Sequence, residues 1–152
     1  MKRMEGVAIG IVKEIDPKEG RIKVEFPWMK PSVRSAWAPV ASLMAGKDRG
    51  AWCMPENDDE ALVAFEQGDF DHPFIVGFLW NGKDKPPETT NKNRIIKTPG
   101  GHQLRFEDSG DKKILIKSNG GIEILLDDRN NSIELRGGGR RITMRNGQVQ
   151  IT

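Results

Sequence analysis

The residues of this chain that could bind a metal or act as nucleophiles are few and scattered. His72 and His102 lie in different segments, and the single cysteine, Cys53, is flanked by Trp52 and Met54. Zinc sites need histidine and cysteine ligands at short spacings, and this chain lacks them. Cys53 also has no basic neighbour that would favour a thiolate. The sequence therefore predicts no metal site and no cofactor.

Carboxylates and glycines form no catalytic pattern either. The acidic run 56–60 lacks the alternating ligands and closing glutamate of a calcium loop. Residues 137–140 resemble a phosphate-binding loop only in their glycines, because no Lys-Ser/Thr pair follows. A cell-wall glycan hydrolase would need a carboxylate pair, and no pair stands out. We therefore expect no catalytic residues and no enzymatic activity, with a glycan hydrolase as the least supported alternative.

The four tryptophans offer a different chemistry, because aromatic rings on a small barrel stack with nucleic-acid bases. Such binding also needs a basic surface. Residues 1–100 instead contain 15 Lys or Arg and 15 Asp or Glu. Packing of the tryptophans in a core or an interface is at least as well supported. A nucleic-acid-binding module therefore stays as the alternative function, and no nucleic-acid partner is expected.

The C-terminal end is basic. From Arg136 onward the chain carries Arg136, Arg140, Arg141 and Arg145 and no acidic residue. Such a run fits contact with nucleic acid or phospholipid. Outward-facing charges that keep strand edges apart explain it as well, and we favour this second interpretation.

Alternating apolar residues and turn signals predict five strands in the N-terminal half. The clearest is 21–26, where Ile22, Val24 and Phe26 point inward until Pro27 ends the strand. The predicted strands are 7–12, 21–26, 35–40, 61–65 and 73–80. Five strands in about 80 residues are typical of a small antiparallel barrel of the oligonucleotide/oligosaccharide-binding (OB) type. We place this barrel at residues 1–80.

A polar segment follows the predicted barrel. Residues 81–93 contain no apolar side chain other than Pro86 and Pro87, which stiffen part of the segment. We therefore expect a linker at 81–93 and a second domain at 94–152.

The second domain has the pattern of a ladder of very short strands. Apolar and polar residues alternate with the period of two that half-buried strands require. Turns such as Ser118–Gly121, Gly137–Gly139 and Asn146–Gly147 separate the strands. Each strand, or rung, offers two inward apolar residues, and Leu104 with Phe106 would form the first rung. The predicted core residues are Ile114, Ile116, Ile122, Ile124, Ile133, Leu135, Ile142, Met144, Val149 and Ile151.

A ladder with only two inward apolar residues per rung predicts a partner that helps to bury them. Burying two aliphatic side chains stabilises a rung by less than the conformational entropy that its ordering costs. The ladder must therefore lie on another domain, or identical chains must surround a shared axis and pair their strand edges. The irregular spacing of the rungs favours intertwined chains over a regular solenoid.

Several stretches resemble the baseplate assembly protein V family, the central spikes of contractile phage tails and related injection systems, including type VI secretion spikes. The similar stretches are Gly20–Trp28, Ala36–Val40, Ala45–Glu56, Asp59–Asp69 and Asn81–Pro87. They cover most of residues 5–88 in the family's order. Gly101–Asp108 is similar to the segment that opens the family's spike helix. Asp58 and Trp80 depart from the family pattern, which affects two loops but not the fold.

The resemblance implies a structural homotrimer that pierces a target envelope. Its three tails would wind into an intertwined triangular β-helix, with the predicted core residues lining the axis. It also implies a separate hub protein, since the chain has no hub domain ahead of the barrel. The chain has no lysozyme-like insertion and no apical His-x-His pair. We therefore expect a blunt end that binds a PAAR-repeat tip protein through a platform of Val149, Gln150, Ile151 and Thr152.

No apolar run reaches the length that crosses a membrane, and residues 1–6 lack the apolar core of a signal peptide. We expect no transmembrane segment and no signal peptide. Assembly would take place in the bacterial cytoplasm, followed by residence in the baseplate of a phage tail or injection particle.

Overall fold

The computed structural model describes residues 3–31 and 33–152. The chain divides into two compact units, Met1–Lys85 and Pro86–Thr152. Within the described residues, the regular elements are strands and one short 3₁₀ turn, η1 (Glu66–Gly68). This confirms the all-β fold class. Among the described residues, no helix is long and apolar enough to span a membrane.

The first unit is built on a curved five-stranded antiparallel sheet with the order β3-β2-β1-β6-β7. Its strands are β1 (Val7–Asp16), β2 (Arg21–Glu25), β3 (Ala38–Pro39), β6 (Glu60–Phe65) and β7 (Pro73–Leu79). A parallel bridge between Val40 and Ile75 joins the two ends of the sheet, and the Ala41 amide donates to the Ile75 carbonyl at 2.8 Å. This arrangement fits the OB barrel predicted for residues 1–80.

The inner face of this sheet forms the core of the first unit. Val12, Ile22, Val24, Val63 and Ile75 have no exposed surface. They alternate along their strands with more exposed residues, as the sequence pattern predicts.

Gly10 faces this core from β1. A Cβ atom at Gly10 would lie 2.6 Å from a methyl group of Val24, so no larger residue fits there. The close approach of β1 to β2 therefore depends on glycine.

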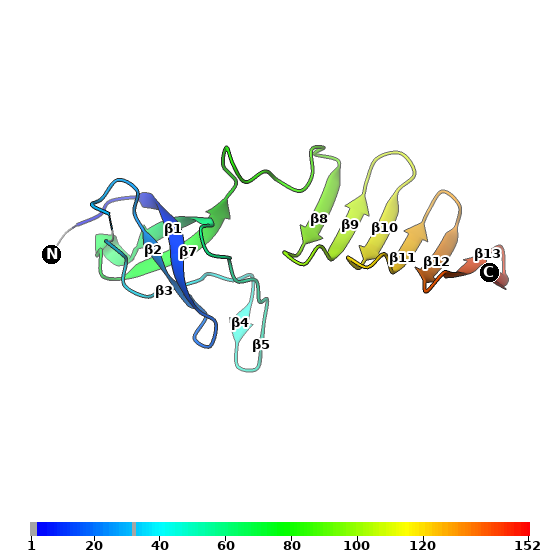
Figure 1. Ribbon diagram of the computed structural model, residues 1–152, viewed down its shortest axis with the longest axis horizontal. Coiled ribbons are helices and arrows are strands. Elements are labelled where there is room, and N and C mark those ends of the chain that lie inside the picture. Colours follow the sequence, from blue (N-terminus) through cyan, green and yellow to red (C-terminus); the bar gives the residue numbers. More distant parts are fainter. Residues whose placement is uncertain (1–2, 32) are drawn as a thin grey trace. The chain divides into compact units, whose positions relative to one another are not determined.

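Two features of this unit differ from the sequence prediction. The strand expected at 35–40 is reduced to the two residues of β3, one of which is Pro39, which has no amide to donate. The segment expected to be a plain loop contains a hairpin, β4 (Ala45–Gly46) and β5 (Arg49–Gly50). Figure 1 shows this hairpin projecting away from the barrel strands.

The segment predicted as a linker carries ordered turns at both ends. The Asn81 side chain accepts hydrogen bonds from the amides of Lys83 and Asp84, each at 2.8 Å. The Glu88 carboxylate accepts from the amides of Thr89 and Thr90. The boundary between the two units falls between these turns, after Lys85.

The second unit is a seven-stranded antiparallel meander, the ladder (Figure 1). Its strands are β8 (Asn93–Lys97), β9 (Gln103–Glu107), β10 (Lys113–Lys117), β11 (Glu123–Asp127), β12 (Ser132–Gly137), β13 (Arg140–Arg145) and β14 (Gln148–Ile151). Strand order in space follows strand order in the chain, so each strand pairs with its sequence neighbours.

This pairing differs from the expected strand hydrogen bonds between intertwined chains. Tight turns explain it: Asn146 and Gly147, between β13 and β14, both have positive φ, at 53° and 72°. Two successive residues of this kind form the turn that closes a two-residue hairpin. The interior strands therefore already have paired neighbours on both sides within one chain.

Candidate assembly face of the ladder

The register of the ladder gathers most of its apolar side chains on one side, although Ile95, Leu115 and Leu125 lie on the other. Ile114 lies opposite Phe106 on one neighbouring strand and Leu126 on the other. Because directly opposite residues share a face, the pairing continues as two columns across the sheet. We call these columns the apolar face: Phe106, Ile114, Leu126, Ile133, Met144 and Val149 in one, and Ile96, Leu104, Ile116, Ile124, Leu135, Ile142 and Ile151 in the other.

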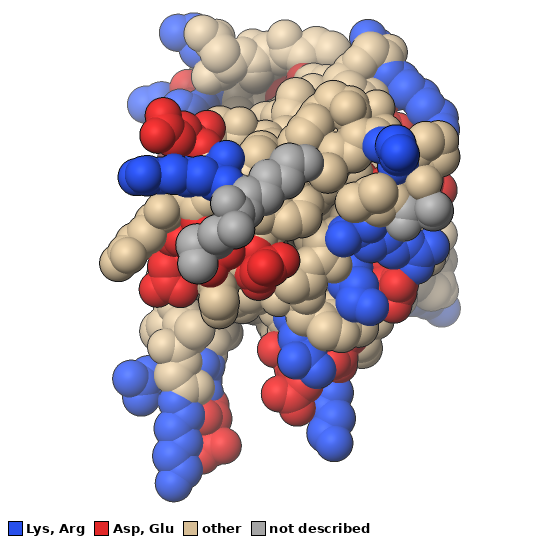
Figure 2. Space-filling model, turned by 90° about the vertical axis from the view of Figure 1, so that its left-hand side faces the viewer, with Lys and Arg blue, Asp and Glu red and all other residues tan. Residues whose placement is uncertain are grey.

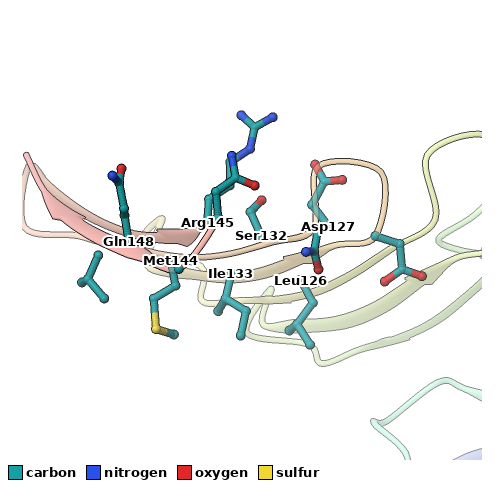
Figure 3. A pocket seen from close by; sticks show the side chains of 12 residues that line it. Leu126, Asp127, Ser132, Ile133, Met144, Arg145 and Gln148 are labelled. Carbon is teal, nitrogen blue, oxygen red and sulfur yellow. The ribbon is translucent and has the colours of Figure 1, made fainter.

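Within the ladder itself, no described residue covers this face. Ile133 is 38% exposed, and exposure rises to 63% at Val149 and 71% at Ile151. A hollow of about 500 Å³ between β11 and β14 is lined by Leu126, Ile133, Met144 and Val149 of this face and by residues of the turns and the opposite face. In Figure 3, Leu126, Ile133 and Met144 point to one side of the sheet, whereas Asp127, Ser132, Arg145 and Gln148 point to the other.

The opposite face of the ladder is charged and paired with itself. The Lys117 ammonium of β10 lies 2.6 Å from the Glu123 carboxylate of β11. Within β12, the Arg136 guanidinium lies 2.6 Å from the Glu134 carboxylate. The Lys117 hydrogen bond is the main reason why the pKa of Glu123 is lowered. Several charged side chains of this face therefore pair within one chain, although Arg145 has no ion pair among the described residues, while the apolar face stays partly exposed.

A carboxylate clamp fixes the start of the ladder. Glu88 accepts a hydrogen bond from the Asn93 side chain at 3.0 Å and lies 2.8 Å from the Arg105 guanidinium. The Asn93 bond, followed by the Thr89 and Thr90 amides, lowers the pKa of Glu88 to about 2. The segment 88–93 is thus attached to β9 by an ionised carboxylate.

Nine of the ten predicted core residues lie on the apolar face. The tenth, Ile122, precedes β11 and packs beside Gly137 at the margin of the sheet. Leu126, which the sequence prediction omitted, stands opposite Ile133 instead. The run Ile124-Leu125-Leu126 carried the signal, but its three consecutive apolar residues hide which ones face inward.

The four predicted platform residues belong to the last strand and its end. Val149 and Ile151 lie on the apolar face, opposite Met144 and Ile142, and Gln150 lies on the charged face opposite Thr143. Thr152 and Arg141 exchange two backbone hydrogen bonds, at 2.8 and 2.9 Å. Since bonded and non-bonded pairs alternate, the backbone groups of Val149 and Ile151 point away from β13, along the outer edge of the sheet.

The structure does not favour a base-stacking platform on the barrel. The Trp37 ring is covered by two cations, with Lys23 at 4.7 Å and Arg21 at 5.2 Å from its centroid. Trp28 packs against Phe26, with ring centroids 5.5 Å apart. On the face in Figure 2, Lys and Arg are interspersed with Asp and Glu, so its described residues form no continuous basic surface.

The other candidate residues stay apart. His72 pairs with Asp69 at 2.7 Å, mainly through a hydrogen bond that raises the pKa of the imidazole, and Cys53 is an exposed free thiol. In residues 3–31 and 33–152, no group of three or more His, Cys, Asp or Glu side chains is placed to hold a metal ion. Chemistry at these residues therefore has no geometric support.

Comparisons with known proteins agree with the predicted barrel. Residues 8–80 match the family model of the type VI secretion system/phage-baseplate injector OB domain. The type VI secretion system spike protein VgrG5 of Pseudomonas aeruginosa is 34% identical over 64% of this chain and 14% of its own length. The spike protein VgrG3 of Vibrio cholerae is 32% identical, over 64% of this chain and 11% of its own length.

A third relative, the actin cross-linking toxin VgrG1 of Vibrio cholerae, is 31% identical over 63% of this chain. The match spans 10% of that toxin, so this chain corresponds to a small part of each relative. Residues 8–80 therefore belong to the phage-baseplate V (injector OB domain) family, and the chain is similar to type VI secretion spike proteins over about two thirds of its length.

Proposed function

We propose that this chain is the central spike of a contractile phage tail or tail-like injection system, acting as a homotrimer. Three ladders surround a common axis with their apolar faces inward, and three barrels form a collar. The role is mechanical, not enzymatic: the spike carries the force of contraction to the target envelope.

The exposed apolar face carries this proposal. Soluble monomers rarely expose a continuous apolar surface of this length, and such surfaces mark sites of association. Much of the charged face is paired within one chain, for example by Lys117 and Glu123, so the ladder has one side for water and one for a partner. Identical ladders offer each other a matching apolar surface.

The pairing of strands within one chain changes the arrangement that we propose for the trimer. Interior strands pair within their own chain, so each chain supplies a complete sheet as one side of a three-sided prism. The apolar columns fill the interior, and the cross-strand ion pairs cover the outside. A sandwich of two sheets would bury the same face, and the family resemblance favours three.

The ends of the assembly suit further partners. The outer edge of β14 presents the backbone groups of Val149 and Ile151, which suit a partner that adds strands to an exposed sheet edge. We place a PAAR-repeat tip protein there, on the platform of Val149, Gln150, Ile151 and Thr152. A separate hub protein would hold the barrels in the baseplate. Assembly occurs in the bacterial cytoplasm, and the envelope is met transiently.

The mass of the full-length chain in solution tests the proposal. Sedimentation equilibrium at micromolar concentration is expected to give three times the chain mass of 17.0 kDa. A twofold mass would favour the sandwich, and a monomer would contradict any assembly through the apolar face.

A nucleic-acid-binding module, the alternative function, makes a different prediction. It requires binding of single-stranded oligonucleotides that weakens steeply as salt rises. We expect no such binding by fluorescence anisotropy at low salt.

A further inference from the structure

The hairpin that projects from the barrel leaves large apolar side chains exposed. We call residues 41–54 the arm; it contains β4 and β5. Leu43 is 99% exposed, and Met44 and Trp52 are more than half exposed. A groove of about 820 Å³, lined in part by Val40, Met44 and Phe78, separates the arm from the barrel. Leu43 and Met44 therefore project from the barrel, whereas the Trp52 ring lies against Gly20 and Met54 packs against the barrel core.

The arm is nevertheless held firmly at its base. The Ala51 amide donates to the Met44 carbonyl at 2.9 Å, and the Ser42 hydroxyl donates to the Met44 and Ala51 carbonyls. The Trp52 ring lies against Gly20, 3.5 Å from the position of a Cβ atom there. Hairpins with strands this short are not stable alone, so an ordered arm with exposed apolar residues fits a docking element.

A second apolar surface lies on the outside of the barrel. Outward positions on a half-exposed strand are normally polar, as on β2, where they are Arg21, Lys23 and Glu25. On β1, β6 and β7 most of them are apolar instead, with Glu60 as a charged exception at the start of β6. We call this surface the outer wall: Val7, Ile9, Leu62, Phe74 and Val76.

The outer wall is continuous across its three strands. Val7 lies opposite Ala64, which lies opposite Phe74, and Ile9 lies opposite Leu62. Val7 is 61% exposed, and Phe74 and Val76 are also exposed. One barrel thus presents an apolar projection and an apolar strip.

Charge supports a match between the arm and the outer wall. Lys47 and Arg49, at the tip of the arm, have no ion-pair partner among the described residues. Along β6, Glu60 is bonded only by the Asn81 side chain, and Glu66 has no ion pair within the described residues. With Asp48 between them, Lys47 and Arg49 give the tip a net positive charge, and Glu60 and Glu66 give the border of the wall a negative one.

We propose that the arm of one chain docks on the outer wall of the next copy, which closes the three barrels into a ring. This inference rests on the proposed three-fold assembly. A ring of three needs two unlike, complementary patches on each copy, whereas a two-fold dimer uses one patch twice. The barrel has two unlike patches of this kind, so a second copy of this chain is the occupant.

Crosslinking of full-length chains tests the contact. In a Cys53→Ala background, one chain carries Leu43→Cys and another carries Val76→Cys, and the two are refolded together. A short bismaleimide is expected to join the two different chains and to join neither chain to itself. The chain with both substitutions is expected to give a covalent trimer. Phe74→Cys serves as a second wall position, and Leu43→Cys with Glu25→Cys on the polar β2 face is the matched control.

The outcomes separate this contact from the trimer itself. Crosslinks confined to one chain, crosslinks between two Leu43→Cys chains, or equal yield in the Glu25→Cys control would overturn the arm contact. If the uncrosslinked protein is still a trimer by mass, the proposed function stands without it. A monomer by mass contradicts both proposals. Crosslinking only after addition of a hub protein assigns the arm to that partner and rejects a second copy.

Discussion

The two units of this protein use the same strand pattern but differ in where their apolar side chains go. In the barrel, five strands curve until Val40 meets Ile75, and the enclosed side chains lose contact with water. In the ladder, seven strands stay side by side, and no apolar residue of the described segment 86–152 is fully buried. The barrel therefore encloses its own core, while the apolar face of the ladder stays partly exposed in a single chain.

The difference lies in the connections between strands. The barrel has long connections, such as the one between β3 and β6, which let distant strands meet. The ladder has only short turns, so its contacts are local and its sheet has no means of folding onto itself. A local meander forms easily within one chain and leaves one face for assembly.

The largest effect should follow from a charge at the centre of the apolar face. Ile133→Asp would bring three carboxylates together on a shared axis, at about 3–5 kcal/mol for each uncompensated buried charge. We expect loss of the trimer at micromolar concentration, measured by sedimentation, with barrel secondary structure retained. Gln148→Asp, on the charged face beside Arg145, is the control and should assemble normally. A stable Ile133→Asp trimer would refute the apolar axis.

A cavity in the barrel core should destabilise the barrel and leave the assembly intact. Phe26 is 1% exposed and contacts Phe65 and Phe70, with ring centroids 6.1 and 5.5 Å away. Phe26→Ala should destabilise the barrel by about 3–5 kcal/mol, because it leaves a cavity in a closed core. Calorimetry should show an earlier barrel transition while the mass stays that of the assembly. Coupled loss of assembly would show that the two units are not independent.

Acid should weaken the ladder through its clamp. The pKa of Glu88 is about 2 in the folded chain, below its ordinary value of 4.5. A lowered pKa stabilises the folded state above pH 4.5, and this contribution is lost as the pH falls toward 2. Urea unfolding of the wild type between pH 6 and 3 should show this loss. Glu88→Gln should reduce the slope, and an unchanged slope would mean that the clamp does not contribute.

The smallest effect concerns His72 in the barrel. Here the contribution to stability is lost as the pH rises, not as it falls. Asp69 raises the pKa of His72 above its ordinary 6.5. A raised pKa stabilises the folded state below pH 6.5, and this contribution is lost as the pH rises through the folded-state value. His72 is largely exposed, so the change should be slight. NMR titration should place the His72 pKa above 6.5, and Asp69→Asn should lower it; no change on substitution would exclude the pair as the cause.

The sequence by itself determined the strand periods, the turns and the family. Ile22, Val24 and Phe26 alternate so regularly that they identify one buried face, and Asn146–Gly147 requires a tight hairpin whatever surrounds it. These are local properties, because backbone preference and side-chain alternation act over a few residues. The division into a barrel and a polar-linked ladder followed from the same local patterns.

Only the tertiary structure decided what depends on distant neighbours. Leu126, not Ile122, stands opposite Ile133, since the register of β11 is fixed by its partner strand and not by its own apolar run. The meeting of Val40 with Ile75 and the projecting arm likewise join or separate residues far apart in the chain. Local pattern predicts that a strand has two faces, but the packing of other strands determines which face is buried and which is left for a partner.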